Sequence, residues 1–402
     1  MIRSTKVSLK FANPGKRSEL DAFVAEYARI TREFVDKLWE LDKVDTLLDS
    51  DLTGSISSWL SARAIQCAGK QASGIVRGTR QKQKQRLWQI EKFKKLGQFK
   101  KARKLQKVYD SKTTSKPSLE NIHPALDSRF VSVDLDNPTS FDGWVTISSL
   151  GNNLKIKLPF KRTEHFNRLG ESGKLRGGIR LFQDRIEFAF DIPDPEQRIS
   201  GKTIGIDIGQ KTIVTCSDGQ SVDSDHHGHT YQSICDTLAR RKKGSNGFRR
   251  AQQHRSNFIG WALNRLDLDG VKRVNRENIK NLGRGRNLGR SLSRWNYFEL
   301  KRRLDARLEE LGVQVVLVSP TYTSQRCSEC GWVRKRNRNG KSFKCGHCGL
   351  ECDSDLNASR NIALDLTPIS KSERLKQPNR KGFFWHVSNQ EPIVPDPHET
   401  LD

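Results

Sequence analysis

Two Cys-x-x-Cys pairs constrain the fold of this chain more than any other feature of its sequence. The four cysteines are Cys327, Cys330, Cys345 and Cys348, and a glycine that allows a sharp turn follows each pair. Four thiolates on two short turns form the closed tetrahedral shell of a structural zinc site, which holds one ion. We therefore predict a zinc ribbon over residues 321–352.

Composition limits the class of protein. The other cysteines, Cys67, Cys216, Cys235 and Cys352, are scattered, which suits a reducing compartment better than a disulfide framework. The apolar fraction of 34% and the length of 402 residues allow two or three domains with cores of their own. No window approaches the run of about 18 apolar residues that a membrane span needs, and the first residues lack the apolar segment of a signal peptide. We expect a soluble, cytoplasmic protein without membrane contact.

The net charge indicates a nucleic-acid partner. The chain carries 72 Lys and Arg against 46 Asp and Glu, a formal net charge of +26. Solubility is the simplest use of such a surface, but here basic clusters alternate with aromatic residues, a pattern typical of nucleic-acid binding. The densest cationic stretch, 80–107, lies in a helical region expected over 55–108. Like charges at this density repel one another, so we expect an arm along a phosphate backbone rather than a merely solvated face.

The hydrophobic period changes twice in the N-terminal half. An alternating strand at 6–11 precedes apolar residues at three- and four-residue spacing over 17–41, which predict an amphipathic helix. Farther along, the period returns to two in short segments separated by Asn, Gly and Pro turn signals. These segments predict a small β-barrel made of residues 1–15 and 120–195, with a helical region, 16–119, inserted into it.

An acid lies in the middle of an apolar strand at the start of the C-terminal half. The strand Thr203–Gly209 contains Asp207, and a second apolar strand follows after a short turn. An ionised carboxylate in an apolar sheet is costly unless it binds a cation or a partner, so we interpret Asp207 as a metal ligand. RNase H-like nucleases begin in this way, and so do sugar-kinase and other folds. A further strand at 313–320, expected to be buried on both sides, completes a predicted α/β domain over 196–320.

Two other positions supply candidate acids. Glu277 follows the segment 271–276, although a lone glutamate is usually a surface residue. Asp353 and Asp355 stand at the start of a helix expected after the ribbon, where an acid is placed to hold a hard cation.

A loop in the same half is rich in histidine. Its members are His226, His227 and His229. The loop is broken by glycine and flanked by acids, so we interpret these histidines as solvent-exposed rather than as metal ligands.

Five motifs of the C-terminal half, taken in order, carry a family resemblance. They are GIDIG at 205–209, ENIKNL at 277–282, SPTYTSQRCSECG at 319–331, CGHCG at 345–349 and D-x-N-A-S-x-N-I at 355–362. This series resembles TnpB, the transposon-encoded RNA-guided DNA nuclease, and its descendants, the compact type V CRISPR effectors. The N-terminal half resembles the wedge and recognition regions of that family in its order of elements alone.

The resemblance implies a multidomain α+β fold. A wedge-like barrel with inserted recognition helices would precede an RNase H-like RuvC domain that holds the zinc ribbon as an insertion. The last RuvC helix would cover 353–367, and the tail, 368–402, is expected to be disordered apart from an aromatic segment at Phe383–Trp385 that docks on the body or on RNA.

The resemblance also implies the catalytic residues. Three RuvC carboxylates would fall on Asp207, Glu277 and Asp355 and hold two Mg²⁺ ions. Asp355 is preferred to Asp353 because the fixed part of the motif is the Asp-x-Asn that starts the helix. The strand before Glu277 has little hydrophobicity, so we expect it to be distorted or at a sheet edge. Two fallback ligands near it are Asp267 and Asp269.

The implied activity is magnesium-dependent cleavage of double-stranded DNA, directed by a guide RNA and carried out by one RuvC site beside a short adjacent motif. The partners would be guide RNA and target DNA, with a monomer on one RNA favoured, in a prokaryotic cytoplasm. A helix at 57–71 resembles the one that reads the motif, through Ser61, Arg63, Gln66, Lys70 and Gln71. The alternatives are a guided repressor that does not cut and a strand-transferring transposase.

Overall fold

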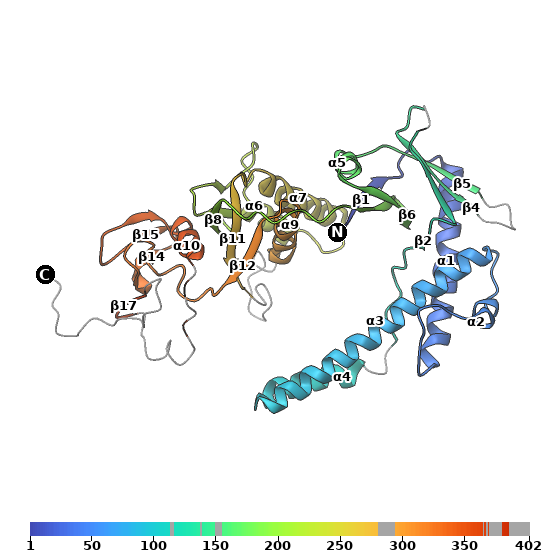
Figure 1. Cartoon of the computed structure of the whole chain (residues 1–402), viewed down its shortest axis with the longest axis horizontal. Coiled ribbons are helices and arrows are strands. Elements are labelled where there is room, and N and C mark those ends of the chain that lie inside the picture. Colours follow the sequence, from blue (N-terminus) through green and yellow to red (C-terminus); the bar gives the residue numbers. More distant parts are fainter. Residues whose placement is uncertain are drawn as a thin grey trace. The chain divides into compact units, whose positions relative to one another are not determined.

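The protein is described here by a computed structural model, and two compact units make up its chain. They are Met1–Pro193 and Asp194–Asp402, and each contains a hydrophobic core (Figure 1). The structure describes residues 1–112, 116–136, 139–148, 155–279, 294–364, 366, 369 and 380–385. None of the helices in these ranges is long and apolar enough to cross a membrane.

Two antiparallel sheets form the β part of the first unit. The first sheet has the order β1-β7-β6-β2, with β1 at Ile2–Ser8, β7 at Arg185–Asp191, β6 at Lys174–Leu181 and β2 at Ala125–Leu126. The second has the order β3-β4-β5, with β3 at Val131–Asp134, β4 at Gly143–Ser148 and β5 at Lys155–Phe160. A short helix, α5 (Glu164–Ser172), joins β5 to β6. The inward side chains of both sheets share one core, but the strands are hydrogen-bonded as two sheets, and a closed barrel is not confirmed.

Helices occupy the chain between β1 and β2. They are α1 (Pro14–Glu40), α2 (Ser50–Gly54), α3 (Ala62–Lys95) and α4 (Phe99–Lys112). The expected amphipathic helix is α1, which packs against α3 and buries a face that includes Phe23, Tyr27 and Phe34. The chain turns at Gly97, whose φ of 65° suits a glycine, so that α4 folds back along α3. Figure 1 shows this pair as a projecting arm of the first unit.

A five-stranded mixed sheet is the centre of the second unit. Its order is β10-β9-β8-β11-β12, in which β8, β11 and β12 are parallel and β8, β9 and β10 are antiparallel. The strands are β8 (Lys202–Asp207), β9 (Val214–Cys216), β10 (Ser221–Val222), β11 (Val271–Glu277) and β12 (Gln314–Val318). Three helices, α6 (Tyr231–Arg240), α7 (Asn246–Asn264) and α9 (Tyr297–Glu310), contribute to the core on one face. Helix α10 (Ser354–Ala363) contacts β8, β9 and β11.

Of the two expectations for the strand before Glu277, distortion or an edge position, the structure shows the first. β11 pairs with β8 on one side and β12 on the other, and its register shifts between Val271 and Arg273. The position of β12, in contrast, differs from the expectation. β12 is the edge strand and only half-buried, with Leu317 45% exposed. The prediction of a strand buried on both sides was therefore wrong for β12, whose residues are all half-buried or exposed at the end of the sheet.

Buried polar residues explain the low hydrophobicity of β11. Asn275 is fully buried and donates its amide to the backbone oxygen of Ala363 at 2.9 Å. Arg276 is 3% exposed and donates two hydrogen bonds of 2.9 Å to the carboxylate of Asp305. Both buried side chains therefore have hydrogen-bond partners, although Nη1 of Arg276 makes no hydrogen bond. The strand does not need a run of apolar residues to be central.

The ribbon lies between β12 and α10 in the chain. It contains β13 (Trp332–Val333), a 3₁₀ turn (Lys335–Asn337), β14 (Arg338–Asn339), β15 (Ser342–Lys344) and β16 (Glu351–Asp353). A segment of the tail, β17 (Phe383–Phe384), pairs antiparallel with β13. The aromatic segment Phe383–Trp385, expected to dock on the body or on RNA, lies on the ribbon, where apolar contacts hold it. Most of the remaining tail, including the part expected to be disordered, lies outside the described residues.

Candidate active site

The ends of two neighbouring parallel strands bring Asp207 and Glu277 together. Gly205 of β8 is paired with Asn275 of β11, and Ile206 with Arg276, so the two acids follow at the same level of the sheet. Because side chains alternate along a strand, Asp207 lies on the same face as Gly205, and Glu277 on the same face as Asn275. That face is the one covered by α10, since Asn275 bonds to Ala363.

Helix α10 delivers the third acid to these strand ends. It approaches β8 so closely that a Cβ on Gly205 would lie 2.0 Å from the backbone oxygen of Ser359 and 2.4 Å from the nitrogen of Ala363. Only a glycine fits there, and this contact fixes the helix against the sheet. Asp355, in the first turn, is 6% exposed.

Asp353 has a different role from Asp355. Its Oδ1 accepts the backbone N–H groups of Asp355 at 2.8 Å and Leu356 at 3.1 Å, so Asp353 is the N-cap of α10. The fallback acids, Asp267 and Asp269, precede β11 and therefore lie at the opposite end of the strand from Glu277. Geometry thus favours Asp355 as the third member of the group.

A cavity of about 410 Å³ lies beside these acids. Its lining includes Asp207, Asp355, Arg338 and Lys341, the last two from the ribbon hairpin. Arg338 donates to Oδ1 of Asp355 at 3.0 Å, and the Lys341 ammonium donates to Oδ2 at 2.6 Å. Lys341 also contacts the hydroxyl of Thr212. The ribbon therefore supplies two cations to the carboxylate that α10 brings in.

Burial raises the pKa values of two of these carboxyl groups, Asp207 and Glu277. Burial, and then the nearby charges of Glu277 and Asp355, raise the pKa of Asp207 to about 7, while Arg338 opposes the shift. Burial also raises the pKa of Glu277, and a 2.5 Å hydrogen bond from the Thr323 hydroxyl works against that increase. Crowded, buried oxygen ligands of this kind fit divalent cations such as Mg²⁺, whose charge removes the repulsion.

The ribbon brings its four cysteines into one group. The Sγ atoms of Cys327 and Cys348 are 3.6 Å apart, as are those of Cys330 and Cys345, and all four lie within 4.8 Å of one another. A tetrahedral zinc with Zn–S bonds of about 2.3 Å places its sulfur atoms about 3.8 Å apart. The thiol group therefore fits one zinc ion.

Hydrogen bonds join the ribbon to α10. Asn357 accepts the N–H of Ser328 at 2.9 Å and donates to the backbone oxygen of Arg326 at 2.8 Å. Asn361 donates to the same oxygen at 2.7 Å and accepts a hydrogen bond of 2.7 Å from the buried guanidinium of Arg326. The two asparagines of the D-x-N-A-S-x-N motif therefore position the base of the ribbon beside Asp355.

Sequence reasoning did not identify the ribbon residues that reach the acids. Arg338 and Lys341 stand among many other basic residues, and Thr323 carries no spacing signal. The one available signal was the position of Lys341 after Gly340, in a turn between two short strands.

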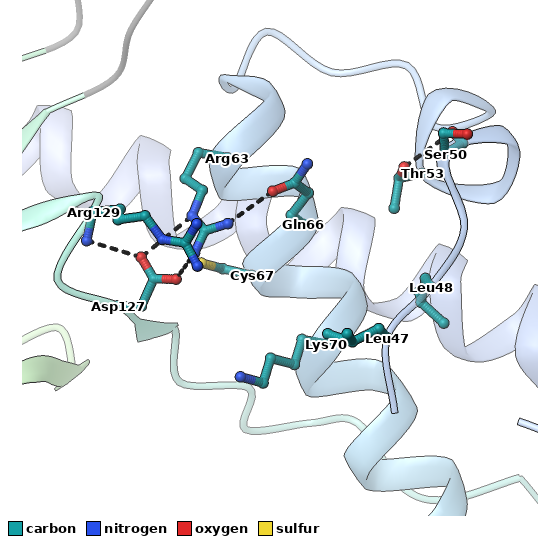
Figure 2. Close-up of a pocket in the computed structure, with 10 residues that line it drawn as sticks. All are labelled: Leu47, Leu48, Ser50, Thr53, Arg63, Gln66, Cys67, Lys70, Asp127 and Arg129. Carbon is teal, nitrogen blue, oxygen red and sulfur yellow. Dashed lines mark hydrogen bonds and ion pairs between the residues drawn. The ribbon is translucent and has the colours of Figure 1, made fainter. Parts of the chain in front are cut away.

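The five residues expected to read a DNA motif divide into two groups. Arg63, Gln66 and Lys70 of α3 line a cavity of about 310 Å³ with Asp127 and Arg129 (Figure 2). Other lining residues are Leu47, Leu48, Ser50, Thr53 and Cys67. Figure 2 shows the Arg63 guanidinium between Gln66 and Asp127. It donates a hydrogen bond to Gln66 and forms an ion pair with Asp127. Lys70 is exposed at the edge of this cavity.

The other two residues have structural partners. Ser61 is buried and caps α3, where its hydroxyl accepts the N–H of Ala64. Gln71 donates to the backbone oxygen of His123 at 2.9 Å and accepts from the Tyr27 hydroxyl at 3.1 Å. These contacts occupy both side chains inside the first unit.

Comparisons with known proteins agree with this geometry. Residues 297–362 match the family model described as Cas12f1-like, TNB domain. The CRISPR-associated endodeoxyribonuclease Cas12f1 of Sulfoacidibacillus thermotolerans is 38% identical over 119 residues, which are 29% of this chain and 27% of that protein. The putative RNA-guided DNA endonuclease InsQ of Escherichia coli is 40% identical over 76 residues, 19% of each chain. This chain resembles TnpB and the compact type V CRISPR effectors.

The resemblance that the motifs predicted is therefore confirmed. The matched segments span only about a quarter or less of these two relatives. A solved structure of a Cas12f1–sgRNA–target DNA complex matches with a TM-score of 0.51 at 14% identity and covers 86% of this chain and 81% of its own. At that identity the similarity shows the fold alone, which has mixed α/β content.

Proposed function

We propose that this protein is an RNA-guided, magnesium-dependent endonuclease that cleaves double-stranded DNA beside a short adjacent motif. The observation that carries the proposal is the convergence of Asp207, Glu277 and Asp355 at one end of the five-stranded mixed sheet. The named activities of the relatives support it. The partners are then guide RNA and target DNA, in the cytoplasm of a prokaryotic cell.

The three carboxylates would hold two Mg²⁺ ions, which when bound activate a water for in-line attack and stabilise the leaving oxygen of a phosphodiester. Asp207 and Glu277 would be held in place by the sheet, and Asp355 by the fixed helix α10. Arg338 and Lys341 add positive charge beside the cavity, where a scissile phosphate carries negative charge. The four thiolates would hold one zinc, which fixes the ribbon and with it these two cations.

Plasmid cleavage by the protein purified with its own RNA tests the proposal. That RNA is sequenced first, so that the target can be matched to it. We expect cleavage with Mg²⁺ and none with a chelator, and we expect Asp207→Asn, Glu277→Gln and Asp355→Asn each to abolish cleavage while RNA and DNA binding remain. Asp353→Asn is the matched control, because asparagine also caps a helix and the acid site is untouched.

Three results would contradict the proposal in different ways. Full cleavage by the Asp207 and Asp355 variants would overturn the site. Guided binding by the wild-type protein without any cleavage would indicate the repressor alternative. Joined DNA strands in place of cut ends would indicate a transposase.

A further inference from the structure

The structure brings together a third group of side chains of metal-binding type, separate from the acids and the cysteines. Asp225 and His229 lie in the loop between β10 and α6, and His254 lies on α7. One ligand atom from each of the three lies within 4.8 Å of the others. Only His229 belongs to the histidine trio that the sequence displays; His226 and His227 are not members of the group.

Backbone hydrogen bonds orient the carboxylate of this group. Oδ1 of Asp225 accepts the N–H groups of His227 and His229, both at 2.9 Å. The turn is closed at Gly228, whose φ is 77°, and its N–H donates to the backbone oxygen of Asp225. Oδ2 is thereby left to face the His229 ring, with Nδ1 at 3.2 Å. The carboxylate is only 12% exposed, so its direction is well defined.

The third side chain comes from a separate element. The rings of His229 and His254 are 4.9 Å apart and nearly perpendicular, at 86°. α7 is part of the core of the second unit through Phe258 and Ile259, and Thr230, directly after His229, begins α6 with a capping box. Both ends of the group are therefore attached to well-packed helices, while both imidazoles reach solvent.

We propose that Asp225, His229 and His254 form a binding site for a divalent transition-metal ion of the zinc class. Two imidazoles and one carboxylate are the ligands of three-coordinate protein sites that keep a further position for water. Ligand atoms around a zinc ion with bonds of about 2.0–2.1 Å lie about 3.4 Å apart, a distance that small rotations of the solvent-reaching rings provide. Nitrogen ligands favour zinc, nickel or cobalt over magnesium. The bound ion links the loop 223–230 to α7, on the side of the sheet edge formed by β10.

The metal content of the untagged, full-length protein tests this site. After dialysis against zinc and removal of free ion, we expect two zinc ions per chain, one in the ribbon and one here. His229→Asn, His254→Asn and Asp225→Asn should each reduce the content to one, and millimolar Mg²⁺ should leave the second ion in place. His226→Asn is the matched control, since it changes a histidine of the same loop that is outside the group, and it should keep two.

A spectroscopic readout separates the two sites. Cobalt loaded into the ribbon gives thiolate charge-transfer absorption, whereas cobalt at the histidine site gives only ligand-field bands. We expect His254→Asn to lose those bands and keep the charge-transfer absorption. One zinc per chain in the wild-type protein, or a second ion that persists in a His229→Asn/His254→Asn double variant, overturns the proposal. Circular dichroism of each variant without the second ion shows that loss of binding is not loss of folding.

Discussion

The raised pKa of Asp207 makes the stability of the second unit depend on pH. Without a bound cation, folding favours the protonated carboxyl, because burial and two neighbouring acids raise its pKa from 3.8 to about 7. The resulting stabilisation is fully present below about pH 4 and is lost as pH rises through 7.

Asp207→Asn should therefore stabilise the magnesium-free protein. The difference in free energy of unfolding, variant minus wild type, should increase between pH 4 and 7 by at most about 4 kcal/mol. Above that range the difference should stay constant. Urea unfolding followed by tryptophan fluorescence measures the difference. Asp353→Asn, which changes an exposed cap, should show no such rise. A difference between Asp207→Asn and wild type that does not change with pH would contradict the buried environment of this acid.

On the proposed function, Lys341 would compete with the metal ion for the carboxylate of Asp355. Its ammonium lies 2.6 Å from Oδ2, and the lysine side chain is 37% exposed. Such a partly exposed pair is worth about 1 kcal/mol, which corresponds to about a fivefold change in an equilibrium constant. Lys341→Met should lower the Mg²⁺ concentration for half-maximal cleavage by about that factor.

Lys344→Met is the control for that titration. Lys344 lies on the same hairpin but pairs with Glu351, away from the acids. An unchanged or higher magnesium requirement in Lys341→Met would show that Lys341 does not compete with the ion.

At the scale of elements, the ribbon depends on a short piece of the tail. Phe383 and Trp385 are 1% and 3% exposed, and the backbone oxygen of Trp385 accepts a 2.7 Å hydrogen bond from the buried guanidinium of Arg326. Losing a buried aromatic side chain costs about 3–5 kcal/mol, and the loss of this oxygen leaves Arg326 without one of its partners.

A chain that ends after residue 379 should therefore have a less stable ribbon than one that ends after 385. We expect a lower melting temperature and faster removal of zinc by a thiol-site chelator for the shorter chain. The longer chain keeps the contacts of β17 and serves as the control. Equal zinc-removal rates for the two would contradict a stabilising role for β17.

Two features of the second unit were predictable from sequence because each is local. The spacing of the cysteine pairs predicts that the four thiols form one group. Asp207 was recognisable as a candidate ligand because a carboxylate in an apolar strand is costly unless it binds a cation or a partner. The central position of β11 was not predictable, since Asn275 and Arg276 are satisfied by Ala363 and Asp305, which are distant in the chain. The contacts of Arg338 and Lys341 with Asp355 were not predictable for the same reason, because they depend on how the ribbon packs against α10.

At the scale of the whole molecule, the charge of the first unit should control RNA affinity. Exposed cations of α4 include Lys100, Arg103, Lys104 and Lys107. Each phosphate contact that is lost reduces the slope of log affinity against log salt by about 0.7–0.9. Changing all four residues to glutamine should reduce that slope by about 3 in filter-binding titrations.

Helicity is the control for this variant. Glutamine has a helix propensity close to that of lysine and arginine, so circular dichroism should be unchanged. An unaltered salt slope with intact helices would place the RNA elsewhere on the protein.

The order of the acids along the chain has a consequence for synthesis. Asp207 and Glu277 precede the ribbon, but Asp355 follows it, and α10 is fixed only when Gly205 and the ribbon are both in place. Domains generally fold in order from the N-terminus as the ribosome extends the chain, so the first unit and its cationic arm emerge and fold before the acid site is complete. On the proposed function, a nascent or prematurely terminated chain would therefore hold nucleic acid before it is able to damage it.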